Sequence, residues 1–138
     1  MKKSNYKYRT GAQQGLASFG KITFSFEYCD STKDYCLSAW GKDRIFATLN
    51  RLKEISGKTF HELNRDRVLH FRQVFWEKTI EKNGFPDKRV SEFEPFHFAL
   101  LGVNGQKARV YGGYADGVFY IVWFDLEHKI WPTFLKHT

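Results

Sequence analysis

The segment from Val118 to Phe124 constrains the fold of this chain more than any other feature of the sequence. It reads Val-Phe-Tyr-Ile-Val-Trp-Phe and is almost continuously apolar. Successive side chains of a β-strand point to opposite faces, so an apolar run of this kind belongs to a strand that is covered on both sides. The run is far shorter than the ~18 apolar residues of a membrane span. We therefore expect a central strand with packed layers on both faces of its sheet.

Two turn signals place this strand in a three-strand meander. The dipeptides Asn104-Gly105 and Asp116-Gly117 favour tight hairpins, because both of their residue types tolerate a positive φ. Strand patterns cover residues 96–103 before the first turn and 107–114 between the two turns. We expect these strands and the central one to pair antiparallel in chain order.

The N-terminal half predicts one strand and two helices. Residues 21–28 alternate apolar and polar side chains, which is the pattern of a strand. Residues 42–56 carry apolar side chains at helical spacing. Thr59 and Glu62 form a capping-box pattern, so a second, short helix should begin there. The segment 65–76 fits either a continued helix or a strand, and we favour a strand over about 69–75.

The fold class that follows is α+β: an antiparallel sheet ending in a three-strand meander, with two N-terminal helices packed on one face. Residues 77–94 are charged and contain Asn83-Gly84-Phe85-Pro86, which predicts a long surface loop. A length of 138 residues fits one domain of ordinary size. We expect a basic, flexible N-terminal arm over 1–20 and a single domain over 21–138.

The charge of the chain favours an anionic partner. The sequence has 22 Lys and Arg against 15 Asp and Glu, a net charge of +7. Four of the cations lie in the first ten residues, where there is no acid: Lys2, Lys3, Lys7 and Arg9. We expect this tail to add non-specific affinity for polyanions without setting the function.

A second basic cluster lies within the predicted domain. Arg65, Arg67, His70 and Arg72 stand close together, and Asp66 is the only acid among them. Guanidinium groups bind phosphate through paired hydrogen bonds, so this stripe is a candidate nucleic-acid-binding site. The alternative is a solvated basic edge that binds nothing.

Four residues near the end of the meander are candidate catalytic groups: Arg109, Tyr111, His128 and Lys129. The first two share one face of their strand, and the other two follow the end of the neighbouring strand. Such a cluster can cleave RNA without a metal: a base takes the 2′-hydroxyl proton, a cation stabilises the pentacoordinate phosphate, and an acid protonates the leaving oxygen. The alternative is structural, with Arg109 paired to a carboxylate and His128 capping a strand end.

Other chemistries have weaker support. Cys29 and Cys36 fit two reduced thiols of a cytosolic protein. Asp125-x-x-His128 has the spacing of a metal site, but the other histidines are scattered, so we expect no metal. Phosphate-binding glycine motifs are missing, and we expect no cofactor. Without an apolar span or a signal-peptide core, we expect a cytoplasmic protein with no membrane partner.

The element order and the C-terminal segment resemble the RelE/ParE toxin superfamily, small bacterial proteins in which two N-terminal helices pack on an antiparallel sheet. The resemblance lies in Ala108-Arg-Val-Tyr-Gly-Gly-Tyr114, in the apolar strand that follows, and in His128-Lys129. It is best over residues 96–132. Many members cleave messenger RNA, with an arginine in the penultimate strand and a His/Arg/Lys/Tyr cluster after the last one.

The resemblance implies a toxin-like endoribonuclease, an mRNA interferase of a bacterial or phage toxin-antitoxin or defence system. Its substrate would be RNA, on the ribosome in many members, and its protein partner a cognate antitoxin. Two alternatives stay open. One is a non-catalytic module on the same fold that binds nucleic acid or protein. The other is an accessory or immunity protein of a mobile element.

Overall fold

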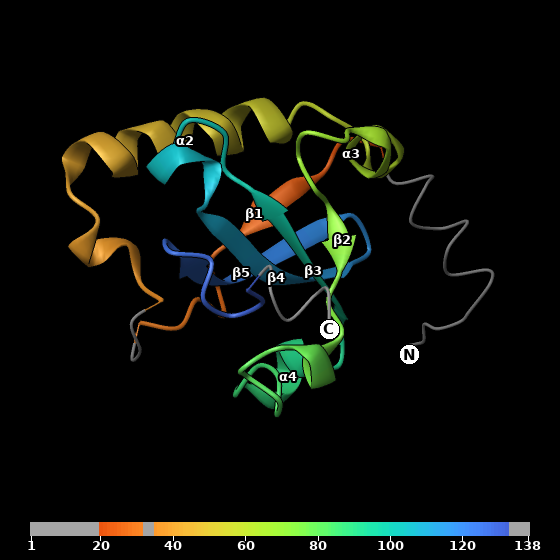
Figure 1. Cartoon of the computed structure of the whole chain (residues 1–138). Coiled ribbons are helices and arrows are strands. Elements are labelled where there is room, and N and C mark those ends of the chain that lie inside the picture. Colours follow the sequence, from red (N-terminus) through yellow and green to blue (C-terminus); the bar gives the residue numbers. More distant parts are fainter. Residues whose placement is uncertain (1–19, 32–34, 133–138) are drawn as a thin grey trace.

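The structure, a computed structural model, describes residues 20–31 and 35–132 of the chain (Figure 1). The basic arm predicted over residues 1–20 therefore lies outside the described residues, apart from Gly20. The polyanion-binding role expected of that arm stays a prediction.

Within the described residues, five strands form one sheet in the order β1-β5-β4-β3-β2. Their bounds are β1 Thr23–Ser25, β2 Arg72–Gln73, β3 Glu94–Ala99, β4 Arg109–Ala115 and β5 Val118–Asp125. β3, β4 and β5 pair antiparallel in chain order, which confirms the predicted meander. β5 lies between β4 and β1, as expected of the apolar strand.

The expectation of a wholly antiparallel sheet is wrong, because β1 pairs parallel to β5. An alternating apolar pattern identifies a strand but carries no information about its direction relative to a neighbour. β2 is also shorter than the predicted strand over 69–75. It is a two-residue edge strand paired antiparallel to β3.

The two hairpins of the meander differ in length. Ala115 pairs with Val118, and the two residues between them, Asp116 and Gly117, have φ values of 52° and 85°. This is the predicted tight turn, with positive φ at both central positions. The β3–β4 connection is longer, because β3 ends at Ala99 and the turn at Asn104-Gly105 belongs to a short 3₁₀ segment, η3 (Asn104–Gln106).

The described part of the chain has three α-helices, which match the predicted positions in part. α2 (Lys42–Ile55) and α3 (Phe60–Arg65) confirm the two predicted helices. The capping box is formed: the Glu62 amide donates to Thr59 Oγ1 at 3.1 Å, and the Thr59 amide donates to Glu62 Oε1 at 2.9 Å. The short helix α4 (Lys88–Ser91) lies in the segment that was predicted as a loop.

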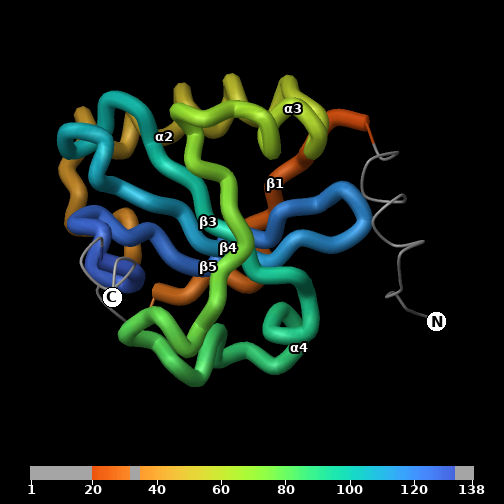
Figure 2. The backbone as a smooth tube through the Cα atoms, turned by 45° about the vertical axis from the view of Figure 1, so that its right-hand side comes forward, coloured from red at the N-terminus to blue at the C-terminus, as the bar shows by residue number. Residues whose placement is uncertain are grey.

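The sheet is covered on both faces, as the apolar strand predicts (Figure 2). Leu52, Ile55 and Leu63 of α2 and α3 pack against one face. The other face is covered by α4, which contributes Val90, and by irregular segments that bring Phe85 and Trp131 onto Trp123 and its neighbours. The segment 77–94 is therefore a covering layer with buried side chains and not a free surface loop. Among the described helices, none combines the length and apolar character that crossing a bilayer requires.

Candidate functional site

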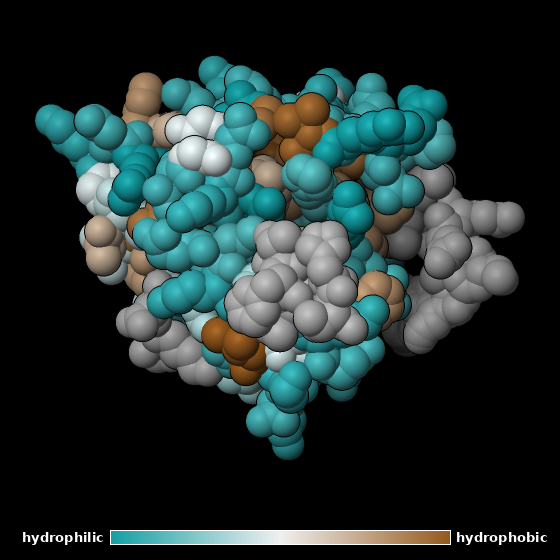
Figure 3. Space-filling view, viewed as in Figure 1, coloured by the Kyte–Doolittle hydropathy of each residue, from teal (hydrophilic) through white to brown (hydrophobic). Residues whose placement is uncertain are grey.

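A groove of about 480 Å³ lies beside the edge strand β2, where the connection from α3 enters the sheet. All four residues that the sequence predicts as nucleic-acid-binding line this groove: Arg65, Arg67, His70 and Arg72. Lys78 and Phe75, which sequence reasoning did not select, line it as well. Figure 3 shows that hydrophilic side chains cover most of the face viewed in Figure 1, with a few small apolar patches.

Among the described residues, the cations of the groove have no carboxylate partner. Arg65, Arg67, Arg72 and Lys78 are exposed, and within the described residues none of them forms an ion pair. Asp66 is the one acid among the described residues that line the groove. It binds the backbone instead: its Oδ1 accepts the amides of Val68 at 3.0 Å and Leu69 at 3.2 Å.

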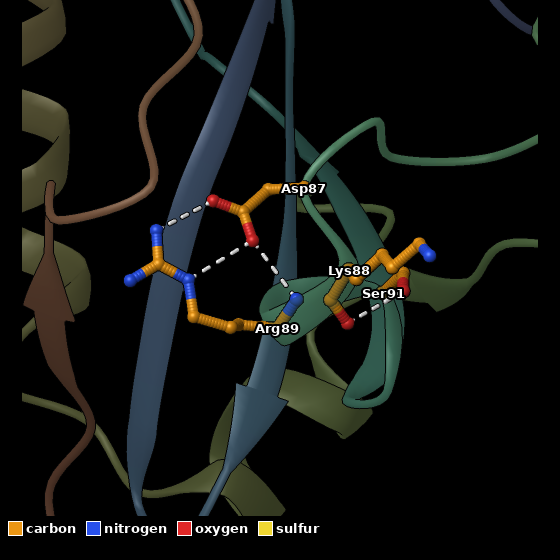
Figure 4. A network of polar contacts seen from close by, with 4 residues as sticks. All are labelled: Asp87, Lys88, Arg89 and Ser91. Carbon is orange, nitrogen blue, oxygen red and sulfur yellow. Dashed lines mark hydrogen bonds and ion pairs between the residues drawn. The ribbon is translucent and has the colours of Figure 1, made fainter.

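Arg89 on α4 provides the contrast (Figure 4). Its Nη2 donates to Asp87 Oδ2 at 2.8 Å and its Nε donates to Asp87 Oδ1 at 3.2 Å. A guanidinium held in this way has its charge compensated locally, and the Asp87 carboxylate raises the pKa of Arg89 further. The groove cations have no such partner among residues 20–31 and 35–132, so this part of the protein presents net positive charge to an anion.

The turn before β2 directs His70 to the groove. Asp66 holds the amides of the turn, and the Leu69 carbonyl accepts the Ala99 amide at 2.7 Å, which ties the turn to β3. His70 then adopts a φ of +55°, a conformation that is uncommon for a residue other than glycine. Its side chain is exposed, and Arg72 follows on β2 opposite His97.

The predicted catalytic residue Arg109 lies in a different environment. It is only 9% exposed, and its Nη1 donates to the carbonyls of Gln106 (2.6 Å), Lys107 (3.1 Å) and Ala108 (3.2 Å). Burial lowers the pKa of this guanidinium. Its contacts hold the η3 turn in place, and they are made to backbone carbonyls and not to the carboxylate that the structural alternative expected.

Tyr111 is fully buried, and its ring stacks on His97 with centroids 5.0 Å apart. Desolvation raises the pKa of its hydroxyl well above the ordinary value. The strand period correctly placed Arg109 and Tyr111 on one face. It could not show that the irregular segments cover that face, and this cover leaves neither side chain accessible to a phosphodiester.

His128 and Lys129 lie at the end of β5 in a turn fixed by Asp125. The two carboxylate oxygens of Asp125 accept the amides of Lys129 (2.9 Å) and Ile130 (2.7 Å). Burial raises the pKa of Asp125, although these two hydrogen bonds act in the opposite direction. Arg109 pairs in register with Asp125, three residues before His128, so both belong to the same end of the sheet. That their side chains lie close together stays a prediction.

The four predicted catalytic residues therefore do not form one accessible cluster. Lys129 is exposed, His128 is partly exposed, and Arg109 and Tyr111 are buried. Cys29 and Cys36 are both free thiols. Over residues 20–31 and 35–132, no three His, Cys, Asp or Glu side chains are grouped in a way that could hold a metal ion.

Comparison of the chain with family models, with curated proteins and with solved structures finds no match. The relation to RelE/ParE toxins therefore stays a prediction from the sequence. Of the two groups of predicted site residues, the one that lines the basic groove is exposed.

Proposed function

We propose that this protein binds RNA in the basic groove between α3 and β2. The observation that carries the proposal is the uncompensated charge of Arg65, Arg67, Arg72 and Lys78, which line one groove and form no ion pair within the described residues. Cations that converge without carboxylate partners favour a polyanionic ligand, and phosphate is the anion that arginine forks fit best. RNA is the nucleic acid that the resemblance of the C-terminal segment implies.

The binding is tested by fluorescence anisotropy with a labelled oligoribonucleotide of about ten nucleotides, within the usual range of single-strand site sizes. A groove variant combines Arg67→Gln, Arg72→Gln and Lys78→Gln, which remove charge and keep side-chain length. A control variant combines Lys42→Gln, Lys53→Gln and Lys88→Gln, three exposed cations outside the groove. Both variants carry the same change in net charge.

We expect the groove variant to lose at least tenfold in affinity while the control variant stays within about twofold of the parent protein, because counter-ion release requires phosphate contact with the substituted cations. Equal losses in the two variants would show binding driven by net charge alone and would refute a groove site. Circular dichroism of both variants checks that they are folded.

A second proposal is that the bound RNA is cleaved, as expected of a toxin-like endoribonuclease. It is supported by His70, an exposed imidazole among the groove arginines. His70 would take the proton of a ribose 2′-hydroxyl as that oxygen forms a bond to the adjacent phosphorus. The bond from phosphorus to O5′ breaks, an imidazolium or water protonates O5′, and the products carry a 2′,3′-cyclic phosphate and a 5′-hydroxyl. An arginine of the groove would stabilise the extra charge of the pentacoordinate phosphate.

The test of cleavage uses His70→Asn, because asparagine tolerates the positive φ of this position. His61→Asn, an exposed histidine of α3 outside the groove, is the matched control. Loss of a general base typically costs 10²–10⁴-fold in rate, so we expect that loss in the first variant only, with RNA affinity retained. Equal cleavage by parent and His70→Asn protein, or no cleavage product with a cyclic phosphate, would refute the catalytic proposal and leave a binding module.

A further inference from the structure

Phe75 is an exposed aromatic side chain at the basic groove. It is 47% exposed and lies two residues after the end of β2. Five other large apolar residues of the described chain are comparably exposed (Phe26, Phe46, Leu49, Val68 and Ile80), and none of them lines this groove. An exposed aromatic ring beside a charged groove can stack on a ligand that has both charge and a flat apolar face.

The surroundings of Phe75 hold the ring and leave part of it accessible. The Trp131 ring meets it edge-on, with centroids 6.3 Å apart and an interplanar angle of 87°. The Lys78 ammonium lies 5.8 Å from its centroid, within the range of a cation–π contact. Trp131 is itself only 7% exposed, so Phe75 packs against a buried side chain.

Cations and a stacking ring together are what a single-stranded nucleic acid requires. Arg72 and Phe75 both line the groove and stand three residues apart in the chain, a span of at most about 10 Å, so both side chains can contact neighbouring parts of one short strand. Stacking needs an open base face, and paired bases in a duplex have theirs covered by the adjacent pairs. Double-stranded RNA is also read across long stretches of its grooves, whereas about 480 Å³ is the size of a site for one small group.

We propose that the groove selects single-stranded RNA, with one unpaired base stacked on Phe75 and the adjoining phosphates held by Arg67 and Arg72. This inference rests on the proposed binding of RNA and adds the class of strand that is bound. It assigns Phe75 the selectivity for open bases and the arginines the affinity for phosphate. The two contributions are therefore separable by experiment.

The experiment compares a fluorescent oligoribonucleotide of about ten nucleotides with the same strand annealed to its complement, in anisotropy titrations at one salt concentration. The variants are Phe75→Leu, which keeps an apolar side chain without an aromatic face, and Phe75→Trp, which restores one. Ile80→Ala, an equally exposed apolar side chain outside this groove, is the matched control.

We expect the parent protein to bind the single strand at least tenfold more tightly than the duplex. Phe75→Leu should lose about tenfold for the single strand, within the range of one base–aromatic stack, and should leave duplex binding and the salt dependence unchanged. Phe75→Trp should retain the preference, and Ile80→Ala should match the parent.

Two results would overturn the inference while leaving the groove as an RNA site. One is an unchanged affinity of Phe75→Leu for the single strand, and the other is an equal loss for both ligands. A heparin oligosaccharide that binds as tightly as the single strand would also overturn it, since heparin has charge but no base to stack. Failure of the proposed function is distinct from all three, because the triple groove variant would then bind RNA as the parent does.

Discussion

The salt dependence of RNA binding gives a quantitative test of the groove, and the perturbation is the double substitution Arg67→Gln with Arg72→Gln. In the part of the chain that the structure describes, four cations that form no ion pair line the groove: Arg65, Arg67, Arg72 and Lys78. If each contacts one phosphate of a single strand, log K falls with log salt at about 0.7 per contact, a slope of about −2.8 in total. Between about 50 and 200 mM salt, the affinity should then fall about 50-fold.

Removing two of the four contacts should flatten the slope by about 1.4. The loss over the same salt range should then shrink to about sevenfold. This difference between variant and parent does not depend on cations elsewhere in the chain, because both proteins share them. The assay is an anisotropy titration at several salt concentrations and one fixed pH.

A double variant whose slope equals that of the parent would refute the assignment of these arginines to phosphate. The substitution Lys42→Gln with Lys53→Gln removes the same charge from α2 and should leave the slope unchanged. If it flattens the slope as strongly as the groove variant does, the RNA is bound by the general field of the protein and not in the groove.

Three further predictions concern the fold that supports the groove. Gly112→Ala should lower the free energy of unfolding in urea by about 1–3 kcal/mol, because a Cβ there would clash with the carbonyl of Tyr120 and the ring of Phe119. Gly57→Ala is the control and should be nearly neutral, because a Cβ there would make only an ordinary van der Waals contact with the Glu54 carbonyl. Thr59→Ala should cost about 1 kcal/mol through loss of the α3 cap, and an unchanged melting temperature would contradict this. Asp125 has a raised pKa in the folded state, so its stabilising contribution is complete below its unfolded pKa of about 3.9 and is lost as the pH rises through the folded value. Asp125→Asn should therefore cost more stability near pH 4 than near pH 7, and a cost that grows with pH would show a lowered pKa instead.

Much of the fold follows from local patterns in the sequence. The apolar run of β5, the Asp116-Gly117 turn and the capping box at Thr59 each have one favourable structure, because the chemistry that decides them lies within a few residues. The direction of β1 did not follow, since a strand of three residues carries the same alternation whether it pairs parallel or antiparallel. The short α4 was also missed, because its four residues are ordered by Asp87 and by burial of Val90 and not by a helical period.

In the candidate site, too, the features set by neighbouring residues were predictable and those set by distant residues were not. The basic stripe was predictable, since Arg65, Arg67, His70 and Arg72 are close in sequence and therefore close in space. Phe75 and Trp131 are far apart in sequence, and both line the groove. They meet only because the segments that cover the sheet face opposite α2 and α3 pack together. The same packing buries Arg109 and Tyr111, whose shared face was correctly predicted. Whether a strand face is exposed depends on segments that are far away in sequence, so the local pattern of a strand cannot predict it.

The most direct test of the central claim is to find where RNA touches the protein. Ultraviolet irradiation of the complex with a single-stranded oligoribonucleotide, followed by trypsin and mass spectrometry, identifies the peptides that are cross-linked at contact distance. The groove account predicts a cross-link in the peptide from Gln73 to Lys78, which contains Phe75, and its loss in Phe75→Leu protein. Cross-links confined to residues 1–9, or to peptides of α2, with none in the peptide from Gln73 to Lys78, would contradict the account.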